Sequence, residues 1–402
     1  MAWFTSLGAR VPAFLNVVLL AHIFGEGSDF ATAYVLLFAV NAAVAYLVNN
    51  FSETASLAAG SDQAARLPGA LVALAIVGPA VTIAAVGVSW LAVGAAATMG
   101  VAQVLIAERR ARLLVAGDIG FAYGSVVLRD LPITAALAAV GLGFLTLGPV
   151  AATGLVWFGV WCQCLVLTWF VRRRLGNDAI GRPAENTTPW QTAVLILVGA
   201  IGLAGLPVMI RSGLARLGSA DELVEFEALD RLGYIVSIAV LGGVGTELQR
   251  RWARSASVER ARLELRTTVL ILLSLGMIAA VFAFLVGTAP LKLLFGQSSI
   301  DDASPRVMAV VLLGGGLNLA AIACSRFLLA AGRYSAVAGA FGSALVISGV
   351  SILFAASHGA LAAASVTIAA NAIALAVLGL VVYSDSAGTP GRPEHNVVPS
   401  VA

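Results

Sequence analysis

Five charged side chains lie within or beside long apolar stretches of this sequence: Arg10, Arg129, Asp130, Asp230 and Arg231. A guanidinium group binds phosphate or carboxylate oxygens in pairs, so an arginine in an apolar setting can hold an anion. A carboxylate in the same setting can take up a proton or Na⁺. Because charges among apolar residues are rare and usually functional, these five residues are the first candidates for a binding site.

Arg129 and Asp130 are neighbours in the sequence. Adjacent residues of a helix point about 100° apart, so we expect the two not to pair with one another and each to need another partner or water. If their helix starts soon after Arg112 they lie near its middle, and if it starts at Leu131 they lie at its end. Asp130 is the candidate residue for coupling to a proton or Na⁺.

The surrounding sequence has the composition of a membrane protein: 11% of its 402 residues are charged, 60% are hydrophobic, and the mean hydropathy is +0.96. The uncharged runs at 67–107 and 131–171 are each long enough for two helices of about 20 residues. Further spans are expected at 4–22, 30–52, 186–210, 228–246, 267–291 and 307–325, with a pair at 334–384. These runs predict an all-α polytopic integral membrane protein with about 12 transmembrane helices.

The arginines predict the orientation of these helices. Counted alternately, the loops on one side hold the arginines at 66, 109–112, 172–182, 250–266 and 326–333, and the loops on the other side hold acidic residues at 221–227 and 301–302. Positive residues favour the cytoplasmic side, and an even number of spans puts both termini there. We expect a multi-pass protein of a bacterial inner membrane.

The two halves of the chain share short motifs. Residues 20–25 followed by Asp29 are similar to 214–218 followed by Asp221, and 104–107 before an arginine are similar to 327–330 before Arg333. Each motif falls on the same predicted side of the membrane in both halves, which indicates two parallel six-helix repeats. We therefore predict an N-terminal lobe at 1–180, a C-terminal lobe at 181–384 and a disordered cytoplasmic tail at 385–402. Transporters commonly bind substrate between such repeats.

Asn16 and Asn41 are expected to line a polar cavity between the lobes, although hydrogen bonding between helices would also account for them. Proline removes a helix hydrogen bond and bends the axis. The candidate hinges are the sites where proline or a Gly and Pro pair interrupts a predicted span, namely Pro12, Gly78 with Pro79, and Gly205 with Pro207.

Several stretches carry a resemblance to a known family: Gly8-Ala9-Arg10, residues 20–25, 228–232, 293–296 before Asp301, and 325–330. They resemble the flippases of the multidrug, oligosaccharidyl-lipid and polysaccharide (MOP) superfamily, in particular its polysaccharide-export and lipid II flippase branches. The resemblance implies a flippase that moves a polyprenyl-diphosphate-linked oligosaccharide or a cell-wall precursor by alternating access. It also implies polysaccharide or cell-wall assembly enzymes as partners.

Matches to arginines in the central cavity of the lipid II branch fall on Arg10 and Arg231. Asn16 stands where that branch has a further arginine, and Val44 with Ala45 stands in place of an arginine pair. Because these cations are missing, the resemblance implies a lipid-linked saccharide other than lipid II.

Other functions fit the same pattern: a cation-coupled multidrug antiporter of the same fold, a membrane glycosyltransferase or polymerase, or a non-transporting scaffold. The sequence has no Gly-rich phosphate loop and no paired His and Cys spacing, and its three histidines accompany no nucleophile, so we do not expect an enzyme. We expect no cofactor, no metal and no nucleic acid. Transport would be coupled to a proton, to Na⁺ or to the membrane potential, with membrane lipids around the protein.

Overall fold

The computed structural model describes residues 11–24, 29–58, 67–86, 89–116, 118–146, 148–176, 190–219, 221–230, 248, 251–252, 257–295 and 300–384. All regular structure in these ranges is helical. Nine of the described helices are long and apolar enough to cross a membrane, and two shorter apolar helices, Val11–Leu20 and Gly69–Ala85, lie in the N-terminal half. The prediction of an all-α polytopic membrane protein is confirmed.

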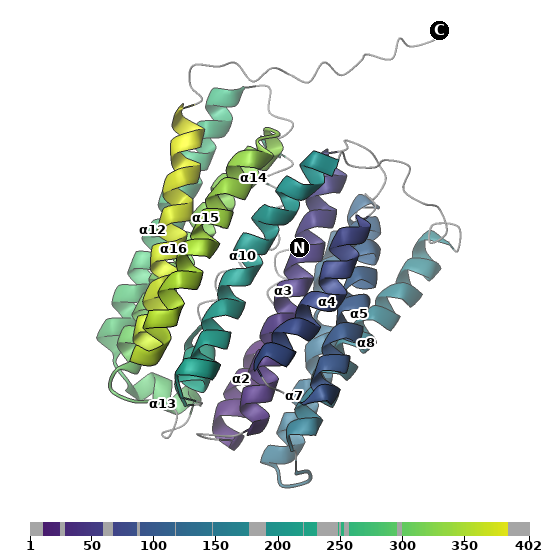
Figure 1. Ribbon diagram of the computed structural model, residues 1–402, viewed down its shortest axis with the longest axis vertical. Helices are drawn as coiled ribbons and strands as arrows, with labels where there is room; N and C mark the ends of the chain where they lie inside the picture. Colours follow the sequence, from purple (N-terminus) through teal and green to yellow (C-terminus); the bar gives the residue numbers. More distant parts are fainter. Residues whose placement is uncertain are drawn as a thin grey trace.

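The N-terminal half consists of α2 (Val11–Phe24), α3 (Asp29–Ala58), α4 (Gly69–Val86), α5 (Trp90–Val115), α6 (Ile119–Gly124), α7 (Val127–Gly141) and α8 (Pro149–Leu175). The C-terminal half consists of α10 (Trp190–Leu217), the helical residues 221–230, α12 (Val258–Val286), α13 (Ala289–Phe295), α14 (Ser304–Ala330), α15 (Tyr334–Ala355), η1 (Ala356–His358) and α16 (Ala360–Ser384). Figure 1 shows the two groups of roughly parallel rods, with α10 between them beside α3.

The helices of the two halves pack in the same pattern. In the N-terminal half α2 packs on α7, α4 on α5, and α8 on both α5 and α7. In the C-terminal half α10 packs on α15, α12 on α14, and α16 on both α14 and α15. This correspondence is what two parallel six-helix repeats require. The predicted lobe boundary at 180 and the tail at 385–402 lie outside the described residues, so they stay predictions.

Neighbouring helices approach one another closely at several glycines. A Cβ atom at Gly159 of α8 would overlap the carbonyl oxygen of Arg129 on α7, and one at Gly202 of α10 would overlap the backbone of Phe341 on α15. Small residues allow membrane helices to pack with backbones in contact. Gly159 and Gly202 therefore serve helix packing, one within each half.

The helices are not interrupted at two of the candidate hinges. The helix α4 runs through Pro79 and α10 runs through Pro207, whereas Pro12 lies in the first described turn of α2. Pro79 cannot donate to the carbonyl of Ala75, and that carbonyl instead faces Gly100 of α5, where a Cβ atom would overlap it. At this position the proline accompanies a close helix contact. A hinge role for Gly78, Gly205 and the three prolines stays a prediction.

Candidate functional site

Arg129 and Asp130 form a bidentate ion pair. The Nε atom of Arg129 donates to Oδ1 of Asp130 at 2.7 Å, and Nη2 donates to Oδ2 at 2.9 Å. The two side chains are 6% and 0% exposed. The prediction that these neighbours would not pair is wrong. The 100° rule fixes the directions of the Cβ atoms, but the arginine side chain is long enough to turn back to the adjacent carboxylate.

The ion pair lies near the middle of its membrane span. The short helix α6 and the helix α7 are joined through a turn at Ser125 and Val126, and together they form a candidate span over Gly120–Gly141. Of the two positions that the sequence allowed for Arg129 and Asp130, the structure has the mid-span one. A charge at this depth needs an opposite charge beside it, and here each side chain provides that charge for the other.

An aromatic row on α3 faces the guanidinium group. The central carbon of the Arg129 guanidinium lies 4.8 Å from the ring centroid of Phe38. Phe30, Tyr34 and Phe38 are spaced four residues apart, with successive ring centroids 6.4 Å and 5.8 Å from one another. A guanidinium over an aromatic face is attracted by the ring, most strongly where water is excluded. The arginine is therefore held by both α3 and its own helix.

Asn16 joins α2 to the same part of α7. Its Nδ2 atom donates to the backbone carbonyl of Asp130 at 3.2 Å, and its Oδ1 atom accepts from the hydroxyl of Thr134 at 2.6 Å. The hydroxyl of Thr134 also reaches the backbone carbonyl of Pro12. The structure thus brings Asn16 to Asp130 as two members of one buried cluster, and the contact it shows for Asn16 is a hydrogen bond between helices.

Asn41 belongs to a second polar contact of the N-terminal half. Its Oδ1 atom accepts from Nε2 of Gln103 on α5 at 2.9 Å, and both side chains are buried. The Nδ2 atom of Asn41 is buried without a hydrogen-bond partner among the described atoms. Elsewhere in the same half, Gln163 of α8 donates to the hydroxyl of Ser125. The interior of the N-terminal half is therefore polar at several points.

A second buried ion cluster lies in the C-terminal half and is centred on Arg211 of α10. Its Nε atom donates to Glu227 and its Nη2 atom donates to Asp230, each at 2.6 Å. Its Nη1 atom donates to the carbonyl of Pro207 at 3.1 Å, and the group lies 5.5 Å from the ring of Phe226. Asp230, which the sequence pointed out, is thus a partner of Arg211. Arg10 and Arg231 lie outside the described residues.

Sequence reasoning missed Arg211 because the uncharged run was taken to end at Ile210. It also placed Glu227 in an acidic loop, whereas the structure buries it. A usable signal was present: Glu227 and Asp230 are three residues apart, so on one helix they lie on the same face. Such a face requires a cation from a neighbouring helix.

Glu225 joins residues 221–230 to the start of α14. Its carboxylate accepts a hydrogen bond from the hydroxyl of Ser304. Burial raises the pKa of Glu225 above its ordinary value, the charges of Asp301 and Glu222 raise it further, and the hydrogen bond from Ser304 acts in the opposite direction. This carboxyl therefore lies among other acidic groups at the end that bears the acidic loops.

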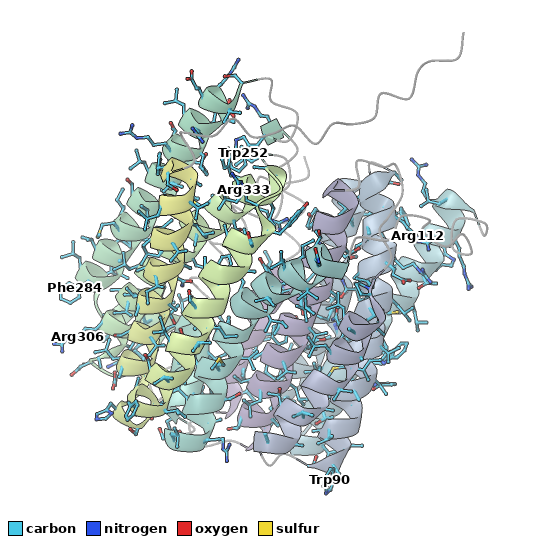
Figure 2. All side chains as sticks on the ribbon, turned by 45° about the horizontal axis from the view of Figure 1, so that its top comes forward. Trp90, Arg112, Trp252, Phe284, Arg306 and Arg333 are labelled. Atoms are coloured by element: carbon cyan, nitrogen blue, oxygen red, sulfur yellow. The ribbon has the colours of Figure 1, made fainter. Side chains whose placement is uncertain are left out.

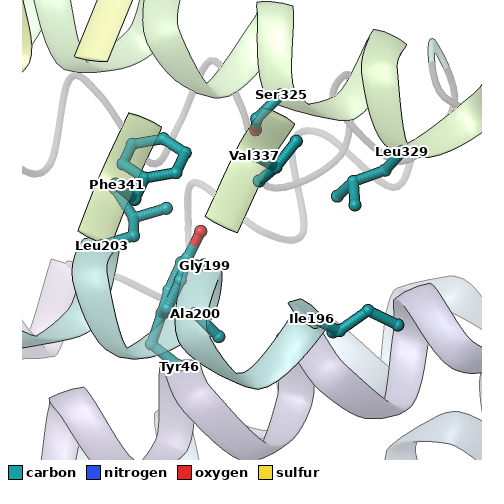
Figure 3. A pocket seen from close by; sticks show the side chains of 9 residues that line it. All are labelled: Tyr46, Ile196, Gly199, Ala200, Leu203, Ser325, Leu329, Val337 and Phe341. Atoms are coloured by element: carbon teal, nitrogen blue, oxygen red, sulfur yellow. The ribbon is translucent and has the colours of Figure 1, made fainter. Parts of the chain in front are cut away.

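A small pocket lies where the two halves meet. Its volume is about 10 Å³, enough for one water molecule. Figure 3 shows Tyr46 of α3 on one side of it, and Ser325 and Val337 of the C-terminal half on the other. On the same seam, apolar side chains of α3 pack against Ala193, Ile196 and Ala200 of α10.

No protein-family model matches the sequence, and no curated protein matches it. Solved structures do match. The lipid II flippase MurJ in an inward closed conformation is 10% identical, with a TM-score of 0.68 over 94% of this chain and 86% of that chain. A MOP superfamily transporter from Pyrococcus furiosus is 11% identical, with a TM-score of 0.61 over 96% and 95%. An outward-facing multidrug resistance MATE family transporter is 13% identical, with a TM-score of 0.60 over 95% of each chain.

Identities this low establish the fold, and the substrates of these proteins do not carry over with it. The overlap extends over nearly the whole chain in each case, and it includes both halves. The chain is a multi-pass membrane protein with the fold of the MOP superfamily, the fold shared by the lipid II flippase MurJ and the MATE transporters.

Proposed function

We propose that this protein is a flippase that moves a polyprenyl-diphosphate-linked saccharide across a bacterial inner membrane by alternating access between its two halves. The observation that carries the proposal is the higher structural similarity to the lipid II flippase, with a TM-score of 0.68 against 0.59 and 0.60 for two multidrug MATE transporters. The orientation follows from the positive-inside rule, with both termini in the cytoplasm.

Arg129 is the cation that suits such a substrate. A guanidinium group at mid-membrane would offset the desolvation of a diphosphate, and it binds phosphate oxygens in pairs. In the structure this group is held by Asp130. Uptake of a proton or Na⁺ by Asp130 would weaken the ion pair and release Arg129 for the diphosphate. Substrate binding and ion uptake would then be coupled through two adjacent residues.

A proton-coupled or Na⁺-coupled multidrug exporter is the second candidate. It is favoured by the cluster of the C-terminal half, where Glu227 and Asp230 converge on the single guanidinium of Arg211. Buried carboxylates within membrane spans often form proton relays. In such an exporter the carboxylates would bind either the coupling ion, a proton or Na⁺, or the organic cation that is exported, and would exchange one for the other.

Reconstituted liposomes test the proposal. A fluorescent polyprenyl-diphosphate disaccharide is placed in the inner leaflet, and its arrival in the outer leaflet is followed with an impermeant quencher. We expect the wild-type protein to speed this transfer well above protein-free liposomes. The double variant Arg129→Gln/Asp130→Asn leaves no unpaired charge. It should lower the transfer rate at least about tenfold, which corresponds to a loss of about 1.4 kcal/mol of binding free energy.

The control is Arg306→Gln, which removes an exposed arginine at the end of the bundle opposite Arg333 (Figure 2). Equal rates for the double variant and the control would contradict the role of Arg129. If the wild-type protein fails to move the lipid but expels organic cations along a pH gradient, and Asp230→Asn abolishes this, the multidrug exporter replaces the flippase.

A further inference from the structure

Six arginines gather at one end of the N-terminal half. The end of α5 carries Arg109, Arg110 and Arg112, and the last turn of α8 carries Arg172, Arg173 and Arg174. In α5, α6, α8 and the described residues between α5 and α6, the acidic residues are Glu108 and Asp118. Arg112 lies at the end of the molecule opposite Trp90 (Figure 2).

The helix ends that carry these arginines contact one another. The Nε atom of Arg174 lies 3.2 Å from Asp118, which directly precedes α6. The ring of Phe121 on α6 stacks on Phe170 of α8 with centroids 3.7 Å apart. The guanidinium of Arg110 lies 4.9 Å from the ring of Tyr123 on α6. The ends of α5 and α8 that carry these arginines therefore both pack against α6, with Arg110 on one side of it and Arg174 on the other.

Arg109 is the residue that most needs a further partner. It is 8% exposed, and among the residues that the structure describes its one ionic contact is with Glu108 at 3.5 Å, while its buried Nε atom has no hydrogen-bond partner there. A buried charge with one long contact is costly unless another group satisfies it. The free carbonyls at the C-terminal end of α5 stabilise the Arg109 charge little. The helix dipole acts within the last turn, and Arg109 precedes that turn.

The adjoining surface has the chemistry of the lipid headgroup level. Trp169 of α8 is exposed, and the guanidinium of Arg173 lies 5.4 Å from its ring. Exposed tryptophans and arginines at the end of a membrane span mark the membrane interface. Basic sites between transmembrane helices on the cytoplasmic side bind the phosphates of anionic lipids.

We propose that the ends of α5 and α8 bind the headgroup of an anionic phospholipid of the cytoplasmic leaflet, with the lipid phosphate reaching Arg109. Arg172 and Arg173 bind the same headgroup from the exposed side. The site is distinct from the proposed transport site, because it lies at the end of the span and Arg129 lies at mid-span. The lipid holds the α5 and α8 ends together and is not the transported molecule.

Native mass spectrometry of the full-length, delipidated protein measures this binding, with phosphatidylglycerol and phosphatidylcholine as probes. We expect phosphatidylglycerol to bind at least about tenfold more tightly, given the basic residues near the surface. Arg109→Gln should weaken its binding about fivefold, and Arg172→Gln/Arg173→Gln about 25-fold. The Arg172→Gln/Arg173→Gln variant changes exposed residues only, so it still tests lipid binding if Arg109→Gln does not fold.

Arg266→Gln is the matched control, since it removes an exposed arginine from the cytoplasmic extension of α12 and should leave the affinity unchanged. Equal affinity of the wild-type protein for the two lipids would overturn the proposal. So would equal phosphatidylglycerol binding by the control and the Arg172→Gln/Arg173→Gln variant. Displacement of the lipid by millimolar inorganic phosphate would show a site for free phosphate and would also overturn it.

Discussion

Replacing Asp130 with Asn tests whether burial makes the ion pair with Arg129 important for stability. The substitution keeps the shape of the side chain and leaves a guanidinium at mid-span without its carboxylate. Removing one partner of a buried pair costs about 3 to 5 kcal/mol. We expect the lower end of this range, because the contact of Arg129 with Phe38 remains and a desolvated cation–π contact contributes about 2 kcal/mol.

The ion pair of Asp118 with Arg174 is a matched control within the same half. Its side chains are 29% and 65% exposed, so Asp118→Asn should cost about 1 kcal/mol or less. Both variants are unfolded reversibly with increasing SDS in mixed micelles, and the free energies of unfolding are compared with that of the wild-type protein. A double variant, Arg129→Met/Asp130→Leu, replaces the pair with apolar side chains and should recover most of the loss.

Two outcomes would refute the reasoning. If Asp130→Asn costs no more than Asp118→Asn, water reaches the pair and its burial at mid-span is wrong. If the double variant is as unstable as Asp130→Asn, the loss arises from side-chain shape at this position and not from an unpaired charge.

Three further predictions concern packing, pH and the second cluster. Gly159→Ala should lower the free energy of unfolding in SDS by about 1 to 3 kcal/mol, because its Cβ would overlap the backbone of α7. Gly154→Ala on the same helix places its Cβ in open space and should leave this free energy unchanged or raise it slightly. The raised pKa of Glu225 means that its proton stabilises the folded state fully below the ordinary carboxyl pKa and that this stabilisation is lost as the pH rises through the raised value. Thermal unfolding at about pH 4 to 7 should therefore show a smaller fall in stability with pH for Glu225→Gln than for the wild-type protein. Arg211→Met leaves the buried carboxylate of Glu227 without its guanidinium and should lower the free energy of unfolding by about 3 to 5 kcal/mol. Arg216→Gln at an exposed position of α10 should change it by about 0.5 kcal/mol or less.

The membrane spans could be predicted from the sequence because apolarity is a local property of the chain. The run at 307–325 became α14 (Ser304–Ala330), and the run at 334–384 became α15 and α16, divided at η1 next to His358. The helices extend beyond the uncharged runs because their ends reach the membrane surface, where charged side chains are solvated.

The candidate sites could be predicted less well, because charge counting does not show which charges neutralise one another. The fifth span was expected to start at Leu131 or earlier, and only the contact between Arg129 and Asp130 explains how both lie at mid-span. In the same way, Arg211 ended a predicted span although Glu227 and Asp230 permit its burial. The partners of Arg211 come from another helix, and the partner of Arg129 is the next residue, which helix geometry alone would point away from it.

The packing also indicates where movement between the halves would occur. Within each half, helices meet backbone to backbone at positions such as Gly159 and Gly202, where no side chain can move aside. Between the halves, α3 and α10 meet through apolar side chains, next to a pocket that one water molecule would fill. Side-chain contacts of this kind can separate and form again without distorting a helix. The proposed alternating access needs two rigid halves and an interface between them that can open and close. The seam between α3 and α10 would meet that need, and the predicted hinges at Pro12, Pro79 and Pro207 would add to it.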